Sequence, residues 1–530
     1  MGGNPFTSTG CNTCRRRKVK CDETRPECRR CTEHGHVCTG YERERVFIHK
    51  SSTSMGEGPQ KLVRRAHATA DKGTHQLVPV EPEIPRCNTS VELRSQLFQC
   101  FVDCFVPSSE YIRDSTGKNI LQTLPDLAGD SRLLDKAVIS LSSAFLAKQN
   151  QDRHLLEYST KLYGNAIRML NGKIRSGSTL GKDVLYTTVV FQIYELINCS
   201  PPGFSAWIAH VQGSNAITNQ CAGSHGDSAA EKLFHRQLKF VTLCDAIGKR
   251  QAPRLYYPPA KHHDPSQGTE KIDPIDEIMD ELVELTALME EVDDFIEHEV
   301  EDTHEARHMG RRLLDLCFAL EEKLHMICLG MQKRLGVPSL LPPDPEFWSG
   351  FRKSLQTDLF ADHLQFPSMT CAECHLLYWT SLILLYPLID QILASPGCPD
   401  EYRAPLRTGT SENATDASES PLDLTMTGSF PKFTALAVHY ANEICRSVAY
   451  CLQPNMKTLG AQLLLAPLSQ CAQFYCVHGL THEYKWCQMV FMLVPQLGLS
   501  IGFFLKDMVW PKYYSAHRYK PSPPESPSSA

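Results

Sequence analysis

Residues 11–38 read CNTCRRRKVKCDETRPECRRCTEHGHVC and carry six cysteines in the pattern C-x2-C-x6-C-x6-C-x2-C-x6-C. The pattern is an internal repeat of a ligand triad, in which each cysteine recurs 17 residues later. Structural zinc takes four tetrahedral ligands, so six thiolates either fill one ion with two left over or fill two ions if two sulfurs bridge. The even repeat favours two ions. The candidate ligands are Cys11, Cys14, Cys21, Cys28, Cys31 and Cys38.

A disulfide framework would use the same residue type, but it is typical of secreted chains. Residues 1–10 do not resemble a charged start followed by an apolar signal core. The chain contains 22 cysteines, and those outside the repeat are scattered singly through apolar segments. That distribution suits a reducing compartment, where cysteine serves as a small buried hydrophobe. The metal interpretation is therefore favoured over the disulfide one.

The charge of the cysteine repeat is unevenly distributed. Eight basic residues face four acidic ones between the first and last cysteine, and two zinc ions with six thiolates add −2, which leaves the stretch at +2. The basic residues crowd into the first half, whereas residues 32–37 of the second half contain no lysine or arginine. One half is therefore suited to meet phosphate. Its run comprises Arg15, Arg16, Arg17, Lys18 and Lys20.

Residues 10–41 resemble the DNA-binding domain of fungal binuclear zinc cluster transcription factors, with all six ligand positions matched. The resemblance implies that Cys11 and Cys28 bridge the two ions. It also implies that Arg17 and Lys18 read CGG-type triplets in the major groove, a role that suits side chains able to donate to guanine O6 and N7. Arg15, Arg16 and Lys20 are interpreted as phosphate contacts.

Two histidines of the repeat are potential ligands by residue type. His34 and His36 lie between the last two cysteines. Because six cysteines already saturate two ions, we interpret both histidines as loop residues. The basic run also fits a nuclear-import signal, which would add to DNA binding rather than replace it.

Length and composition predict a small zinc-stapled module of two short helices plus a large all-α domain. The chain has 530 residues, of which 42% are apolar, a net charge of −6 and a pI of about 6.4, so a nucleic-acid role has to rest on the local basic run. The predicted organisation is a zinc cluster at 10–41, a flexible linker at 42–91, a helical regulatory domain at 92–515 with a disordered loop near 396–431, and a disordered tail at 516–530.

Apolar residues at three and four spacing predict helices throughout the large domain. The uncharged run 489–505 is interpreted as a buried helix, and no membrane association is expected. Segments 206–213, 233–249 and 378–393 are similar to the all-helical regulatory domain of filamentous-fungal regulators. Trp207 and His210 are interpreted there as core residues. The clearest helical patterns cover 93–106, 133–148, 154–174 and 184–197.

Residues 272–300 form the most acidic segment, with sixteen acidic residues against one lysine within 270–305. Apolar residues from Ile275 to Ile296 follow a coiled-coil spacing, but further apolar positions widen the stripe. We therefore expect a helix packed on its own domain with a solvated acidic face, and hold a coiled coil and an acidic activation surface as alternatives. No heptads follow Cys38, which leaves dimerisation open.

The function predicted from sequence is a sequence-specific DNA-binding regulator of RNA polymerase II genes in the nucleus, in a setting such as a metabolic or secondary-metabolite gene cluster. Its partners are two structural zinc ions and double-stranded DNA, with a homodimer, a partner regulator and a small-molecule effector left open. The alternatives are a zinc-dependent protein-interaction or metal-sensing module on a helical ligand-binding body, and an enzyme. Phosphate-loop, dinucleotide, zinc-protease and serine-hydrolase motifs are absent. Cys371, Cys374 and His375 match C-x-x-C-H, but haem attachment is disfavoured.

Overall fold

The computed structural model divides into two compact units, residues 1–86 and 87–530. The residues that it describes are 9–41, 91–108, 111, 119–128, 131–177, 180–199, 204–220, 229–253, 273–297, 304–341, 345–355, 357–398, 402, 431–508 and 510. The expected linker at 42–91 lies outside this set except for Val91, and the expected tail at 516–530 lies wholly outside it. Most of the expected loop at 396–431 also lies outside, so these three boundaries remain predictions.

The elements of the chain are almost all helices, which confirms the expected fold class. The first unit contains α1 (Asn12–Arg16) and α2 (Arg29–Thr32). The second contains α3 (Val91–Phe105), α4 (Ile120–Ala128), α5 (Arg132–Gln149), α6 (Arg153–Arg175), α7 (Lys182–Asn198), α8 (Ser205–Gln220), α9 (Ala229–Lys249), α10 (Pro274–Glu297), α11 (His304–Leu335), α12 (Pro345–Leu355), α13 (Met369–Ala394), α15 (Lys432–Cys451), η3 (Pro454–Met456), α16 (Lys457–Val477), α17 (Thr481–Leu493), η4 (Val494–Leu497) and α18 (Gly502–Leu505). Strands β1 (Ser339–Leu340) and β2 (Leu364–Gln365) pair antiparallel, with Ser339 opposite Gln365.

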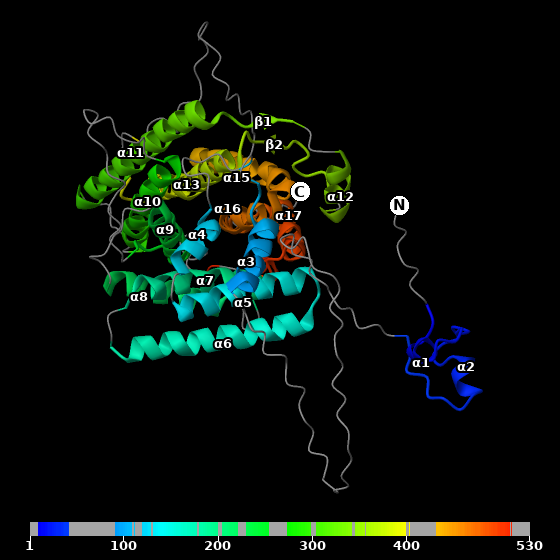
Figure 1. The fold of residues 1–530 in the computed structure, drawn as a ribbon. Coiled ribbons are helices and arrows are strands. Elements are labelled where there is room, and N and C mark those ends of the chain that lie inside the picture. The colour runs from blue at the N-terminus through cyan, green and yellow to red at the C-terminus, as the bar shows by residue number, and fades with distance from the viewer. Residues whose placement is uncertain are drawn as a thin grey trace, which may run out of the picture. The chain divides into compact units, whose positions relative to one another are not determined.

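Helix α13 is the central element of the second unit. It packs against α10, α11, α15 and α16, while α5, α6, α7 and α8 lie beside one another in the cyan part of the ribbon (Figure 1). Its 26 residues are long and apolar enough to cross a membrane, but 83% of its most apolar window is buried inside the unit. The helix is therefore apolar on all sides because other helices surround it.

The helices predicted from apolar spacing in the second unit are confirmed. Capping side chains explain where two of them begin. The Ser131 hydroxyl accepts from Leu134 N at the start of α5, and the Asp152 carboxylate accepts from Leu155 N at 3.0 Å at the start of α6. The C-x-x-C-H match lies within the first two turns of α13, where both cysteine side chains are fully buried. This arrangement leaves their sulfurs no open face for a haem.

Helix α10 packs on its own unit as expected, and its acidic face is only partly solvated, because Glu284, Asp294 and Glu297 are exposed while other carboxylates are paired. Its apolar stripe is buried against α9, α11 and α13. Basic side chains of α9 and α11, with Arg250 just after α9, meet the carboxylates. The ion pairs are Arg236 with Asp273 and Asp276, Lys239 with Asp280, Arg250 with Asp293, Arg334 with Glu277, Lys323 with Glu281 and Arg312 with Glu291. Much of the acidity of this segment therefore serves contacts within the unit.

The uncharged run 489–505 is also different from the prediction, because it is not one helix. Helix α17 ends at Leu493, and a 3-10 turn leads to Gly498, whose φ is 96°. A Cβ at this glycine would lie 2.7 Å from a ring carbon of Phe145 in α5. Only glycine tolerates both the left-handed backbone and this close approach. The regular helix ends just before Pro495, and glycine is required at 498 where the chain passes Phe145.

Candidate metal centre and nucleic-acid interface

The cysteine repeat folds as two backbone copies. Helix α1 begins directly after Cys11 and α2 directly after Cys28, the two members of one repeat position. The Cys11 sulfur accepts from Cys14 N at 3.4 Å at the start of α1. Each helix carries the next ligand, Cys14 or Cys31, in its first turn. The C-x2-C spacing thus brings two sulfurs to one side of each short helix.

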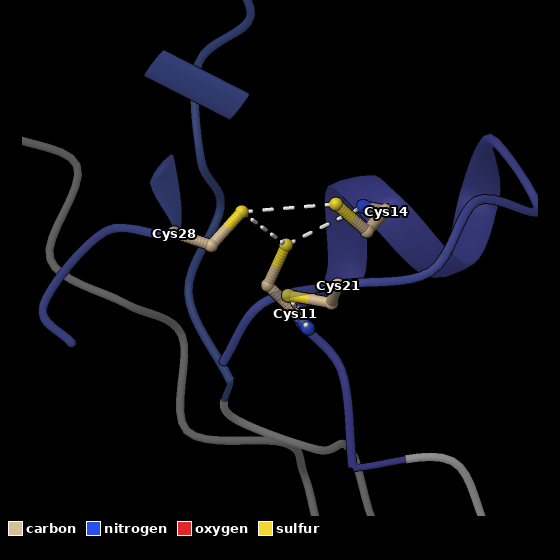
Figure 2. Close-up of side chains that lie close together, drawn as sticks. All are labelled: Cys11, Cys14, Cys21 and Cys28. Carbon is tan, nitrogen blue, oxygen red and sulfur yellow. Dashed lines mark hydrogen bonds between the residues drawn. The ribbon is translucent and has the colours of Figure 1, made fainter. Parts of the chain in front are cut away.

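The six sulfurs converge into two overlapping groups of four. In each group the sulfurs lie within 4.8 Å of one another, and both groups share Cys11 and Cys28. Figure 2 shows the group that also contains Cys14 and Cys21, with the sulfurs of Cys11 and Cys28 facing each other at 3.6 Å. The other group adds Cys31 and Cys38 to the shared pair.

The separations between the sulfurs fit tetrahedral zinc. They are 3.6 Å for Cys11 and Cys28, 3.7 Å for Cys14 and Cys28, and 3.8 Å for Cys11 and Cys31. Ligands at about 2.3 Å from a tetrahedral ion are roughly 3.8 Å apart, whereas a disulfide would hold its sulfurs at about 2.05 Å. Two ions with two shared sulfurs match this arrangement, and no ligand position is left open for water.

The inner thiols of the cluster are buried and resist ionisation on their own. Cys11, Cys14, Cys28 and Cys31 are fully buried. Burial raises the pKa of the Cys14, Cys28 and Cys31 thiols to about 12. Metal ligation deprotonates such thiols because the ion stabilises the thiolate directly. The pKa values of the two half-buried outer ligands, Cys21 and Cys38, are shifted downward.

The backbone N–H groups that donate to the two outer ligands occupy equivalent positions of the repeat. Cys11 N donates to the Cys21 sulfur at 3.4 Å, and Cys28 N donates to the Cys38 sulfur at 3.5 Å. Burial opposes ionisation of Cys21, but the N–H groups of Cys11 and Glu23 outweigh it and lower the pKa of Cys21 to about 7. The donor from Cys28 likewise lowers the pKa of Cys38. Both outer thiols are therefore prepared for ionisation by the same device.

Residues outside the cysteine pattern tie the two halves together. The Asp22 carboxylate accepts from Arg29 N at 3.1 Å and from Arg30 N at 2.7 Å, which satisfies the start of α2 that Cys28 leaves without a side-chain cap. The Tyr41 hydroxyl donates to Thr24 O at 2.8 Å and lies 3.7 Å from the Cys21 sulfur. Sequence reasoning missed both roles, because an aspartate seven residues before a helix start gives no local signal.

The five predicted DNA contacts are exposed at the end of α1. Arg15 and Arg16 form its last turn, Arg17 caps it, and the chain turns at Lys18, whose φ is 56°. Lys20 follows just before the third cysteine. Within the described part of the chain, none of the five makes an ion pair with an acidic side chain. Their charge is available to a partner.

The predicted loop histidines lie away from the sulfurs. His34 and His36 are exposed, and the metal-like groups in the described residues consist of cysteines alone. The structure therefore brings the six cysteines together, displays the basic run beside them, and leaves both histidines outside the cluster.

Comparisons with known proteins agree with this geometry. Residues 9–46 match the fungal Zn(2)-Cys(6) binuclear cluster domain, and residues 96–395, more than half of the chain, match the fungal specific transcription factor domain. The cluster domain binds two zinc ions, for which this chain provides the six thiolates. No solved structure matches the chain.

Similar proteins come from several fungi. An aspercryptin biosynthesis cluster-specific transcription regulator of Emericella nidulans is 55% identical over 47 residues, 8% of each chain. A transcription activator of Alternaria alternata is 38% identical over 84 residues, 16% of this chain and 11% of that one. A Zn(2)-C6 fungal-type transcription factor of Aspergillus fumigatus is 28% identical over 218 residues, 39% of this chain and 53% of that one.

The matched segments thus span between 8% and 53% of these three relatives. The two family matches reach further, because one falls on the cysteine repeat and the other on most of the helical unit up to the end of α13. The chain belongs to the family of fungal transcription factors that join a Zn(2)-Cys(6) binuclear cluster to a fungal specific transcription factor domain.

Proposed function

We propose that this protein is a sequence-specific DNA-binding regulator of RNA polymerase II genes that acts in the nucleus. The observation that carries the proposal is the one-sided basic run: five exposed cations without acidic partners, in the described residues, on a single half of a rigid metal cluster. Such a charge pattern attracts phosphate, and its attachment to a fixed scaffold gives the orientation that base reading needs.

The roles of the cations follow from their positions. Arg17 and Lys18 project from the point where α1 ends, and we assign them to the guanines of a CGG-type triplet in the major groove. Arg15, Arg16 and Lys20 flank that point and are assigned to the phosphate backbone, where they fix register without reading sequence.

The zinc ions are proposed as structural rather than catalytic. Two overlapping sets of four thiolates fill both ions, so neither has a position at which to activate water. The protein is accordingly proposed as a regulator without enzymatic activity. One relative is named as a biosynthesis cluster-specific regulator, and we propose a similar setting for this chain, in which the target genes belong to one metabolic pathway.

A second candidate function keeps the zinc cluster but gives it a protein partner. Tyr41, Thr13 and Asp22 hold the cluster together without help from DNA, so the module is equally a stable platform for protein contacts. Base-dependent binding separates the two candidates, because a protein-interaction or metal-sensing module has no reason to prefer a DNA sequence.

The test combines zinc quantification with selection of bound sequences from a random DNA pool, using the full-length chain. We expect two zinc ions per chain and an enriched CGG-like core. The matched control is Val37→Lys, which adds a cation at the position equivalent to Lys20 in the second half and should leave the enriched core unchanged. Two zinc ions without any enriched sequence would instead support the protein-interaction function.

A further inference from the structure

A cavity of about 310 Å³ lies inside the helical unit, bounded by α7, α8, α9, α10, α13, α16 and the segment that follows α18. Its walls are mostly apolar and include the rings of Phe204, Trp207, Phe240 and Trp510. Small-molecule sites have volumes of about 300–1,000 Å³. The cavity is therefore large enough for a compact organic ligand.

The cavity separates two apolar clusters. Trp207, Val211 and Val241 form a small cluster of their own, distinct from the main core that contains Leu282 and Leu377. Members of both clusters line the cavity. Protein interiors are close-packed, and dispersion contacts are lost wherever a gap lacks atoms on one side. A gap of this size between two clusters indicates space that a bound molecule fills.

Two buried glutamines belong to the wall of this cavity. Gln192 and Gln470 line it and are only 1% and 3% exposed. The Gln192 amide nitrogen donates to Ser214 Oγ at 3.0 Å, which fixes its orientation and leaves Oε1 without a partner among the described residues. Gln470 Oε1 likewise has no partner there. Both oxygens lie beneath the surface of the wall. An unpaired buried acceptor costs about 1–3 kcal/mol, so an adjustment of the wall that brings either oxygen to a ligand donor is favourable.

Two hydroxyl groups and the charged pair of the wall already have partners, while Gln237 and Gln462 add uncharged polar side chains. The Thr380 and Ser469 hydroxyls donate to carbonyls of their own helices, each at 2.6 Å. Lys249 pairs with Asp245 at 2.5 Å, so the wall carries no uncompensated charge in the part that the structure describes. A charged ligand would be desolvated without compensation. The cavity is therefore suited to a neutral molecule.

The segment after α18 forms one wall and is held by another glutamine. Gln473 donates to Met508 O at 2.6 Å, and its side-chain oxygen accepts from Trp510 N at 3.1 Å. The Trp510 ring lies against Gly248 of α9, where a Cβ would be 3.2 Å from the ring. This wall is therefore a built part of the site.

We propose that the cavity binds a neutral, largely apolar ring compound that carries an N–H or O–H group, and that the side-chain oxygen of Gln192 or Gln470 accepts a hydrogen bond from it after a local adjustment of the wall. The four aromatic rings supply flat contact surfaces for such a ligand. The assignment does not rest on DNA binding, since every residue involved belongs to the helical unit.

The test titrates the full-length protein with N-phenyl-1-naphthylamine, a neutral probe with two ring systems and one N–H group that fluoresces in apolar sites. We expect saturable binding of one probe per chain. Ala466→Trp and Cys244→Phe each place a large side chain in the cavity wall and should abolish binding while far-UV circular dichroism stays unchanged. Gln99→Leu on α3, outside the cavity, is the control and should bind as the unmodified chain does.

The N-methyl analogue of the probe tests the acceptors. The unmodified chain should bind the N–H probe about tenfold more tightly, as one buried hydrogen bond requires. The double variant Gln192→Leu, Gln470→Leu should lose this preference. Failure of the unmodified chain to bind the probe saturably, or binding that survives in a folded cavity-filling variant, would overturn the proposal. Equal affinity of the unmodified chain for both probes would overturn the assignment of the glutamines.

Discussion

The two halves of the zinc cluster have the same backbone and different side chains. Val19 N donates to Cys14 O at 3.0 Å in the first half, and His36 N donates to Cys31 O at 2.8 Å at the equivalent position of the second. The chain adopts a left-handed conformation at residues 18 and 23, and again 17 residues later at 35 and 40. Metal ligation therefore explains the shared backbone.

The side chains at those left-handed positions separate the halves. The second half has Gly35 and Gly40, for which positive φ is free of strain, whereas the first half has Lys18 and Glu23. A side chain in this conformation costs roughly 1–2 kcal/mol. The first half therefore accepts strain at a residue that we assign to base reading, which is where a functional side chain is expected to override backbone preference.

The largest expected effect comes from removing a cysteine that belongs to both groups of ligands. Cys28→Ala removes a ligand of both ions, whereas Cys38→Ala removes a ligand of one. We expect Cys28→Ala to lose both zinc ions and all sequence-specific DNA binding, and Cys38→Ala to keep up to one ion. Elemental analysis of the purified proteins measures zinc per chain. Cys100→Ala, at an exposed cysteine of α3, is the control, and retention of two ions by Cys28→Ala would refute the shared-ligand arrangement.

The next effect separates the two classes of cation in the first half. Lys18→Ala should weaken binding to the preferred triplet by about 1–3 kcal/mol and relax its sequence preference. Lys20→Ala should weaken binding to every sequence alike and reduce the dependence of log affinity on log salt by about one unit. Titrations on specific and random duplexes at several salt concentrations measure both. Identical behaviour of the two variants would refute the division into base and phosphate contacts.

A smaller effect concerns the bonds that cross between the halves. Asp22→Ala leaves the N–H group of Arg30 without its acceptor and that of Arg29 with only the Thr24 hydroxyl. The equivalent Thr39→Ala removes a hydroxyl that meets only Thr13. We expect Asp22→Ala to lose zinc to a competing chelator roughly fivefold more readily than the unmodified chain, by analogy with loss of a helix cap. Thr39→Ala should change little. An equal response of both variants would contradict the proposed role of Asp22.

The smallest effect tests backbone strain with the same substitution in each half. A Cβ at Gly35 meets no atom within 4 Å, so Gly35→Ala adds only the strain of its φ of 65° and should cost the module about 1 kcal/mol. Lys18→Ala should leave this stability nearly unchanged, because Lys18 already carries a Cβ. Chelator competition measures the stability of the module, in which Gly35→Ala should have the larger effect. In DNA titrations Lys18→Ala should have the larger effect. A loss of stability in Lys18→Ala equal to that in Gly35→Ala would argue against strain as the cause.

The helices and the metal cluster were predictable because their signals are local. The apolar spacing of residues 154–174 is enough to predict α6, and the cysteine pattern is enough to predict six ligands in two groups. An alignment of the repeat with itself would also have placed Lys18 opposite Gly35. The cysteine spacing repeats in the sequence because the two halves of the cluster share one backbone conformation.

What could not be predicted depends on distant residues. Glycine is required at position 498 because Phe145 of another helix lies beside it, and part of the acidic face of α10 is paired because α9 and α11 bring cations to it. The cavity is built from seven separate segments, and its unpaired glutamine oxygens become visible only after the surrounding helices are placed. The contact between Asp22 and the start of α2 belongs to the same class.

The ion pairs around α10 have a practical consequence for reporter fusions. Acidic, hydrophobic segments are often excised and fused to a heterologous DNA-binding domain to ask whether they activate transcription. Residues 274–297 would leave behind Arg236, Lys239 and the helices that cover their apolar stripe. Such a fusion would expose apolar surface that other helices cover in the intact chain. A positive signal from it would be a property of the isolated fragment and not of the whole protein.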